Sequence, residues 1–267
     1  MAQLRGVEFC LEGDGTALAR HVTAAPPDVV IECTVGDASR ASWTVCRILS
    51  TQVDAPRRRI AMELTDWQAT FDLDDRRVVA HLPGPWPLAL DSLLRTTAQL
   101  FAIATGKALL FHGSSVVRDG VAYVFLGPSG AGKTTSALLS VEAGATILGE
   151  EYACVGGIGS GRPRAYTLPF RQRTGLLTEP QAHPLAALYW LQQAADDEVL
   201  HVSPSRQLTC AVRAVTIGVR HELLMEPAVD LCAALLRTVP VDVLRFRESR
   251  EFWRAIEADR RGAGVAR

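Results

Sequence analysis

The stretch GPSGAGKTT at residues 127–135 constrains this chain more than any other part of the sequence. It matches the spacing G-x-x-x-x-G-K-T, in which two glycines, a lysine and a threonine hold fixed positions. The apolar run 121–126 leads into it, and residues 133–142 have the composition of a helix. A strand, a glycine-rich loop and a helix in that order predict a phosphate-binding loop of the P-loop (Walker A) type.

Each part of this loop has a physical reason. Glycines let backbone N–H groups turn inward onto phosphate oxygens, and the helix N-terminus adds roughly half a positive charge. We expect Lys133 to reach the β- and γ-phosphates and Thr134 to place its hydroxyl on Mg²⁺. The predicted phosphate-binding residues are Gly127, Pro128, Ser129, Gly130, Ala131, Gly132, Lys133, Thr134 and Thr135.

Composition excludes several other classes of protein. Of the 267 residues, 48% are hydrophobic and 21% charged, which is enough apolar material for a substantial core. The formal net charge of −1 and the lack of a long basic run give no electrostatic basis for binding nucleic acid. No apolar run approaches the roughly 18 residues of a membrane span, and none of the six cysteines forms C-x-x-C. We therefore expect a cytoplasmic protein with reduced thiols and no membrane partner.

The pattern predicts a β-rich first part, residues 1–106, that ends in a connecting helix. Its expected strands are 29–35 and 60–64, with a hairpin of 68–73 and 77–82 and a helix at 91–105. No chemical motif appears before residue 83, so the first part is expected to dock a substrate or to support assembly. Whether the chain forms a homo-oligomer is left open.

The second part, residues 107–267, contains the glycine-rich loop and is expected to be an α/β domain. Arg118-Asp119-Gly120 separates two apolar runs, 108–117 and 121–126, which predicts a hairpin and therefore antiparallel pairing of the strand that enters the loop. Further strands are expected at 145–148, 185–191 and 239–246, and helices at 205–215, 222–237 and 249–258. This mixture indicates a mixed sheet flanked by helices.

Three further groups of residues are candidates for the chemistry. Glu150 and Glu151 end a predicted strand one helix after the loop, where a magnesium ligand and a general base are needed. His112 lies on the strand that pairs with the loop strand, close to the loop's mouth, although an ordinary structural histidine is an equal alternative. Arg171 and Arg173 could clamp a γ-phosphate or an acidic substrate, or could simply be solvated.

Residues 109–155, LLFHGSSVVRDGVAYVFLGPSGAGKTTSALLSVEAGATILGEEYACV, resemble the catalytic core of HPr kinase/phosphorylase. They look closest to the shorter HPr-kinase-like proteins of ribosomal-peptide clusters, including lasso-peptide kinases, with phosphoenolpyruvate carboxykinases as wider fold relatives. The resemblance implies an ATP- and Mg²⁺-dependent kinase that phosphorylates a hydroxyl, expected to be serine, of a peptide or small protein. By position it makes Glu150 the general base, Glu151 a metal ligand with Thr134, and His112 part of the catalytic centre.

The chain departs from that family in one respect. The family usually has Asp-Asp where this chain has Glu150-Glu151, and the longer side chain displaces each carboxylate by about 1.5 Å. A misplacement near 1 Å can cost on the order of a hundredfold in rate. Two alternatives to a peptide kinase therefore stay open: a small-molecule hydroxyl kinase, and a nucleotide-binding regulatory protein. A carboxykinase would need a set of metal-binding Lys and His residues that the sequence does not supply. The sequence also does not specify the phosphate acceptor or which nucleotide base the protein prefers.

Overall fold

The computed structural model describes residues 7–12, 29–35, 47–82, 86–168 and 181–265. These residues form helices and two mixed sheets, which confirms the predicted mixed α/β class. Among them, no helix is both long enough and apolar enough to cross a membrane.

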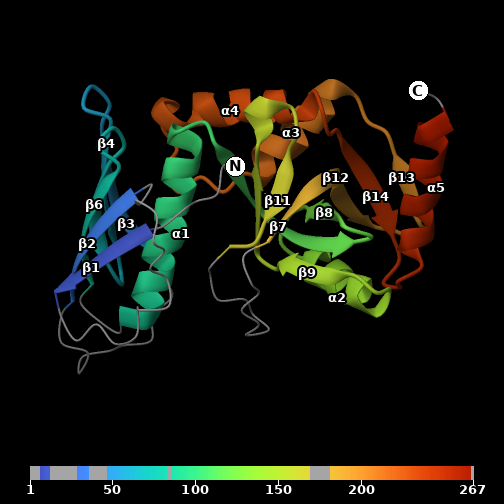
Figure 1. Ribbon diagram of the computed structural model, residues 1–267, viewed down its shortest axis with the longest axis horizontal. Helices are drawn as coiled ribbons and strands as arrows, with labels where there is room; N and C mark the ends of the chain where they lie inside the picture. The colour runs from blue at the N-terminus through green and yellow to red at the C-terminus, as the bar shows by residue number, and fades with distance from the viewer. Residues whose placement is uncertain (1–6, 13–28, 36–46, 83–85, 169–180, 266–267) are drawn as a thin grey trace. The chain divides into compact units, whose positions relative to one another are not determined.

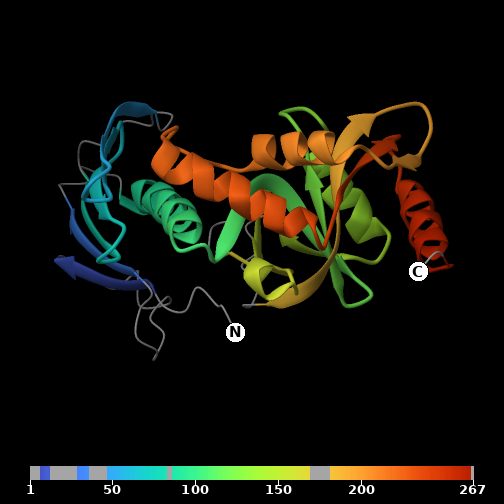
Figure 2. The ribbon, with the colours of Figure 1, turned by 90° about the horizontal axis from the view of Figure 1, so that it is seen from above.

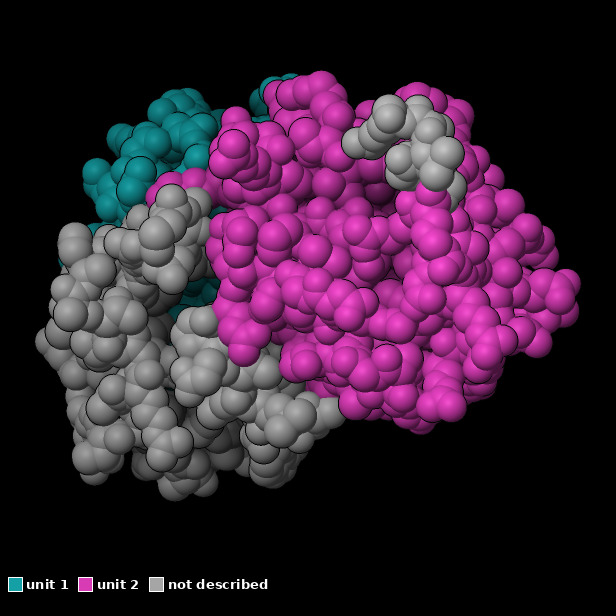
Figure 3. All heavy atoms as spheres, turned by 45° about the vertical axis from the view of Figure 1, so that its right-hand side comes forward, with its two compact units in different colours: residues 1–105, 217–227 teal, residues 106–216, 228–267 magenta. Residues whose placement is uncertain are grey.

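The chain divides into two compact units (Figure 3). Unit 1 comprises Met1–Thr105 and Ile217–Pro227, and unit 2 comprises Gly106–Thr216 and Ala228–Arg267. The division predicted from sequence counts residues 217–227 in the second part, whereas the structure groups them with the first. Helix α4 (Glu222–Leu236) contributes to both units, because the division falls after its internal proline.

Unit 1 is built on a six-stranded sheet in the order β1-β2-β6-β5-β4-β3. The strands are β1 (Val7–Glu12), β2 (Val29–Val35), β3 (Ile48–Asp54), β4 (Arg59–Leu64), β5 (Gln68–Asp72) and β6 (Arg77–Leu82). β1, β2 and β6 are parallel, and β6, β5, β4 and β3 are antiparallel. The predicted β-rich character and the hairpin of β5 and β6 are confirmed.

Helix α1 (Trp86–Ala104) packs against this sheet within unit 1 (Figures 1 and 2). Alternate residues of β4 to β6 are buried, as expected for strands with one covered face. The indole N–H of Trp67 donates to the hydroxyl of Ser92 on α1 at 3.0 Å, so the helix is fixed by a polar contact as well as by apolar packing.

Unit 2 contains an eight-stranded sheet in the order β11-β10-β7-β8-β12-β14-β13, with β9 pairing β7 outside this path. The strands are β7 (Ala108–Arg118), β8 (Val121–Leu126), β9 (Thr146–Gly149), β10 (Tyr152–Gly156), β11 (Arg164–Tyr166), β12 (Ala182–Gln193), β13 (Glu198–Leu200) and β14 (Val241–Phe246). β11 also pairs with β12, so β7, β8, β12, β11 and β10 form a closed ring of strands. β8, β12 and β14 are parallel and the other pairs are antiparallel.

The predicted hairpin before the glycine-rich loop is confirmed. β7 and β8 pair antiparallel from Arg118↔Val121 onward, and the turn residues Asp119 and Gly120 have φ of 53° and 77°. Positive φ at both central positions is the geometry that Asp-Gly favours in a two-residue hairpin. The other neighbour of β8 is the parallel strand β12.

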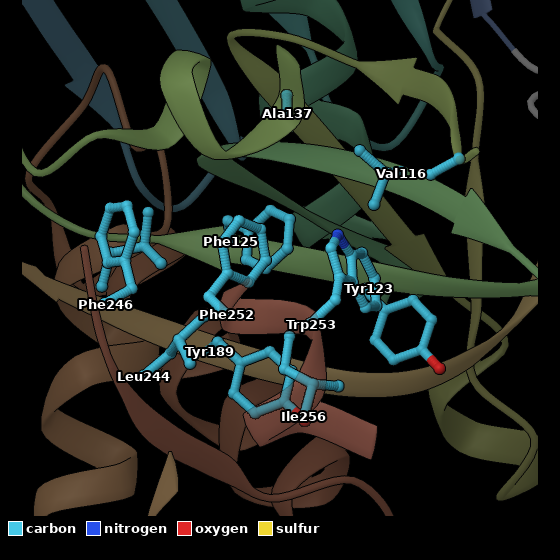
Figure 4. Close-up of a cluster of buried hydrophobic side chains, with 12 residues drawn as sticks. Val116, Tyr123, Phe125, Ala137, Tyr189, Leu244, Phe246, Phe252, Trp253 and Ile256 are labelled. Atoms are coloured by element: carbon cyan, nitrogen blue, oxygen red, sulfur yellow. The ribbon is translucent and has the colours of Figure 1, made fainter. Parts of the chain in front are cut away.

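The remaining helices cover the sheet of unit 2. These are α2 (Lys133–Glu142), α3 (Pro204–Ala214) and α5 (Phe252–Val265), with a 3₁₀ turn at Ile158–Ser160. α2 and α5 share one hydrophobic cluster on the sheet, to which Phe125, Phe246, Phe252 and Trp253 contribute stacked and edge-on rings (Figure 4). Because that cluster joins the strands to α2, it fixes the helix that begins at the glycine-rich loop.

Candidate functional site

The glycine-rich loop (residues 127–132) joins the end of β8 to the start of α2. Its glycines Gly127, Gly130 and Gly132 have φ of 152°, 80° and 98°, values that other residues adopt only with strain. The N–H of Ala131 donates to the carbonyl of Pro128 at 3.1 Å, which forms a tight turn inside the loop. The loop thus has the compact backbone that its glycine spacing predicts.

Two of these glycines are also required by close packing. A Cβ at Gly127 would lie 2.8 Å from the Cβ of Ala131, and a Cβ at Gly132 would lie 2.7 Å from the ring of Phe246. Gly132 is the N-cap of α2, so the strand that carries Phe246 sets where this helix begins. The N–H groups of the first turn of α2 have no intrahelical acceptors, which makes this end of the helix suited to an anion.

Lys133 folds back over the loop. Its Nζ donates to the carbonyls of Gly127 and Pro128, both at 2.9 Å, and the residue is only 8% exposed. Burial lowers the pKa of this ammonium from its ordinary value. An ammonium has three protons, so one remains for a phosphate oxygen while the other two hold the loop.

A second hydrogen bond joins the start of α2 to β7. The hydroxyl of Ser114, which is fully buried, donates to the carbonyl of Lys133 at 2.8 Å. Through this bond the strand that carries His112 and the helix that carries the loop lysine are held together. Ser114 was not predicted as a site residue, because a serine between apolar strand residues carries no signal of its own.

Glu150 and Glu151 form a bend between β9 and β10, which we call the glutamate bend. β9 and β10 lie along the same strand, β7, with Gly149 opposite Ser115 and Tyr152 opposite His112. Two residues separate these paired positions on each strand, so the bend itself does not change the register. The N–H of Gly113 on β7 donates to the carbonyl of Glu151 at 3.1 Å, which ties the bend to this strand.

The two glutamates have different environments. Glu150 is 4% exposed, whereas Glu151 is half-buried. A Cβ at Gly149 would lie 2.4 Å from the carbonyl oxygen of Tyr152, so only glycine allows the chain to turn this tightly before the acids. Different burial is consistent with different roles for the two carboxylates, as the sequence analysis expects.

His112 lies on β7 beside both features. Its ring contacts that of Tyr152 edge-on, with centroids 6.4 Å apart. His112 is exposed on β7, but desolvation of its ring lowers its pKa and the positive charge of Lys133 lowers it further, while the backbone and the charge of Glu151 act in the opposite direction. His112 thus interacts electrostatically with both the loop lysine and the glutamate bend, and the net lowering of its pKa favours the neutral imidazole.

The other predicted residues are placed as follows. Thr134 and Thr135 lie half-buried in the first turn of α2, and Pro128 and Ser129 are exposed at the loop. A hydroxyl and a carboxylate are the oxygen donors that Mg²⁺ accepts together with phosphate oxygens and water, so Thr134 and Glu151 fit such a metal chemically. Arg171 and Arg173 lie outside the described residues.

Two residues at the loop were missed by the sequence analysis. Phe246, at the end of β14, packs against Gly132, and Gln193, at the end of β12, donates from Nε2 to the carbonyl of Gly130 at 3.2 Å. Both are distant from the loop in sequence, and no local pattern connects them to it. Only the parallel order of β8, β12 and β14 brings these strand ends to one edge.

The comparisons with known proteins add little to this geometry. No family model matches the chain, and no curated protein matches it in sequence. Among solved structures it is similar to the Hpr(Ser) kinase/phosphatase from Coxiella burnetii, at 10% identity and a TM-score of 0.33, over 58% of this chain and 98% of that one. The function is therefore inferred from the glycine-rich loop and the residues around it.

Proposed function

We propose that the chain is an ATP- and Mg²⁺-dependent kinase that transfers the γ-phosphoryl group to a hydroxyl group. The observation that carries this proposal is the glycine-rich loop. It combines positive φ at three glycines, an uncapped helix start and a buried lysine folded over the loop carbonyls. Backbone N–H groups, a helix N-terminus and one ammonium are the elements that bind triphosphates in P-loop proteins.

In this proposal each residue has a stated task. Lys133 donates a hydrogen bond to the β- and γ-phosphates, and the N–H groups at the start of α2 bind phosphate oxygens. Thr134 and Glu151 hold Mg²⁺, which neutralises charge on the phosphates when it is bound. Glu150 accepts the proton of the attacking hydroxyl, and neutral His112 lies beside the reacting groups.

The burial of Glu150 limits how its carboxylate can reach an acceptor hydroxyl. A carboxylate that is 4% exposed can reach an acceptor hydroxyl only if the acceptor enters the site or the glutamate bend moves. Glu151 is the more accessible of the two and is the one whose charge acts on His112. Replacing each by Gln separates the roles, because a base contributes mainly to kcat and a metal ligand to the Mg²⁺ requirement.

We propose a serine hydroxyl of a peptide or small protein as the acceptor, on the resemblance of residues 109–155 to HPr-kinase-like proteins. By the same resemblance the fold of unit 2 would be of the HPr-kinase and phosphoenolpyruvate-carboxykinase type. A small-molecule hydroxyl kinase would use the same loop with a different acceptor. Phosphate transfer from γ-labelled ATP to serine peptides, compared with free hydroxyl compounds, distinguishes the two acceptor classes.

The central test uses the two lysines of the chain, Lys107 and Lys133. Lys133→Ala should weaken ATP binding and lower turnover on the order of a hundredfold or more, because a charge directed at the transferred group is lost. Lys107→Ala is the matched control, since Lys107 is exposed and lies before β7. Calorimetric titration with Mg·ATP measures binding, and turnover is measured by release of ADP. If Lys133→Ala binds and turns over ATP as the wild type does, the loop is not the nucleotide site.

A further inference from the structure

The C-terminal end of β12 lies beside the glycine-rich loop. β12 and β8 are parallel neighbours, with Trp190 opposite Leu126, so the residues that follow Trp190 run beside the loop. From there the side-chain amide of Gln193 donates to the carbonyl of Gly130 at 3.2 Å. This hydrogen bond crosses from a strand end to the exposed part of the loop.

The peptide group between Gly130 and Ala131, which Gln193 contacts, is held by two hydrogen bonds. Its carbonyl, on Gly130, accepts from Gln193, and its N–H, on Ala131, donates to Pro128 at 3.1 Å. The carbonyl and N–H of a trans peptide point in opposite directions, so the two hydrogen bonds together fix the orientation of the group. Packing does not fix it, because a Cβ at Gly130 would have no atom within 4 Å.

Orientation of this peptide matters for an anion site. Gly130 has φ of 80°, and glycine passes readily between positive and negative φ. A flipped peptide would break the hydrogen bond from Ala131 to Pro128 and turn the Gly130 carbonyl oxygen towards bound phosphates, where its partial negative charge would repel them. A residue that holds the carbonyl on the outside therefore preserves the loop's affinity for phosphate.

Gln193 is itself held in place by the neighbouring strand. It pairs with Phe246 of β14, and the N–H of the next residue, Ala194, donates to the carbonyl of Phe246 at 3.0 Å. Asp197, further along the same turn, accepts from the backbone N–H of Arg247 at 2.7 Å and from its guanidinium at 2.8 Å. The Gln193 backbone thus has a fixed position from which its amide can reach the loop.

We propose that Gln193 is a positioning residue for phosphate binding: it anchors the Gly130 carbonyl and so keeps this carbonyl oxygen turned away from the phosphates. This inference rests on the proposed function, since it assigns Gln193 a role at the same nucleotide site. It acts through the loop and needs no contact with the substrate.

The test compares Gln193→Ala with Gln192→Ala. Gln192 is the same residue type, is also exposed, and precedes Gln193 on the other face of β12, where it pairs with Arg245. Amide hydrogen exchange of the loop, without nucleotide, reports on the peptide directly. Calorimetric titration with Mg·ATP and Mg·ADP reports on affinity, and thermal unfolding reports on the fold.

For Gln193→Ala we expect faster exchange at the Ala131 amide and roughly 2- to 10-fold weaker binding of both nucleotides, the range that a net hydrogen bond supports. The melting temperature of Gln193→Ala should stay within about 1 °C of the wild type, because the side chain of Gln193 is exposed. Gln193→Glu cannot donate to the carbonyl and adds a negative charge near the phosphates, so it should weaken binding more than Gln193→Ala does, and less so at high salt. Gln192→Ala should behave as the wild type.

Other results would overturn the role of Gln193 or separate it from the proposed function. Unchanged exchange at Ala131 in Gln193→Ala overturns the proposal, whatever happens to binding. Faster exchange with unchanged affinity in a wild type that binds ATP also overturns it, because the anchored peptide would then not matter to phosphate. If the wild type binds no ATP while exchange still rises, the loop anchor is supported and the proposed function fails.

Discussion

Replacing Gly132 by alanine tests whether β14 sets the start of α2. Gly132 has φ of 98°, and an added Cβ would lie 2.7 Å from Cζ of Phe246. A non-glycine residue in the left-handed region costs about 1–2 kcal/mol, and overpacking a well-packed site costs about 1–3 kcal/mol. Phe246 has little room to yield, because it is 2% exposed and stacks edge-on with Phe252 at 5.9 Å. We therefore expect Gly132→Ala to cost about 2–5 kcal/mol of unfolding free energy.

Gly130→Ala is the matched control for the backbone part of this cost. Gly130 has φ of 80°, but an added Cβ would meet no atom within 4 Å. Its substitution should therefore cost only about 1–2 kcal/mol. The difference between the two variants isolates the contact with Phe246 and is expected to be about 1–3 kcal/mol.

Urea unfolding followed by tryptophan fluorescence measures this difference, since Trp253 lies in the same cluster as Phe246 (Figure 4). On heating, 1 kcal/mol corresponds to roughly 2–4 °C in a chain of this order of size. Phe246→Leu shortens the side chain that Gly132→Ala would meet, so the double variant should lose about 1–2 kcal/mol less than the sum of the single changes. Equal stability of Gly132→Ala and Gly130→Ala would refute the reasoning, because the loop would then relax away from Phe246 at no cost.

Three further outcomes are expected. Glu150→Gln should lower kcat by about 10²–10⁴ with little change in ATP affinity, whereas Glu151→Gln should mainly raise the Mg²⁺ concentration needed for half-maximal turnover; equal effects would contradict separate roles. Ser114→Ala should cost about 0.5–1.5 kcal/mol in urea unfolding, because the donor to Lys133 is lost; Ser115→Ala should be neutral or stabilising, because the buried Ser115 hydroxyl has no hydrogen-bond partner among the described residues. The pKa of His201 is raised by its hydrogen bond to Asp242 and by the charges of Asp242 and Asp259, so its stabilisation is complete below its unfolded pKa, about 6.5, and is lost as pH rises through the higher folded value. His201→Gln should therefore destabilise the chain at about pH 6 and have little effect at about pH 9, and a pH-independent effect in thermal unfolding would contradict this.

Local signals were sufficient for the elements that carry the candidate site. The Asp119-Gly120 turn specified the antiparallel pairing of β7 and β8, because Asp-Gly favours positive φ at both central positions of a two-residue hairpin. The glycine spacing specified the loop, since its sequence requires both the strand before it and the helix after it. Where the sequence signals were weaker, the observed ends of helices differ from the predicted ones. Helix α1 begins at Trp86 instead of residue 91, because a proline such as Pro87 is tolerated in the first turn of a helix.

What the sequence did not reveal depends on contacts between distant strands. β3 was missed because it is an exposed edge strand with no alternation of buried residues. The parallel neighbours β1, β2 and β6 were not predicted as such, because parallel pairing leaves no turn signal in the intervening chain. The contacts of Gln193 and Phe246 with the loop were missed for the same reason. β12 and β14 lie beside β8 in the sheet but are distant from it in the sequence.

One strand, β7, connects the separate parts of the proposed site. It presents His112, donates from the Gly113 N–H to the glutamate bend and from the Ser114 hydroxyl to the start of α2. β12 and β14 contact the glycine-rich loop, through Gln193 and Phe246. Changes in β7 should therefore alter nucleotide binding and proton transfer together, whereas changes at the ends of β12 and β14 should alter nucleotide binding first. The helix that begins at Lys133 and the glutamate bend are both tied to this strand, by Ser114 and Gly113, and the pairing of β7 keeps the same register on either side of the bend.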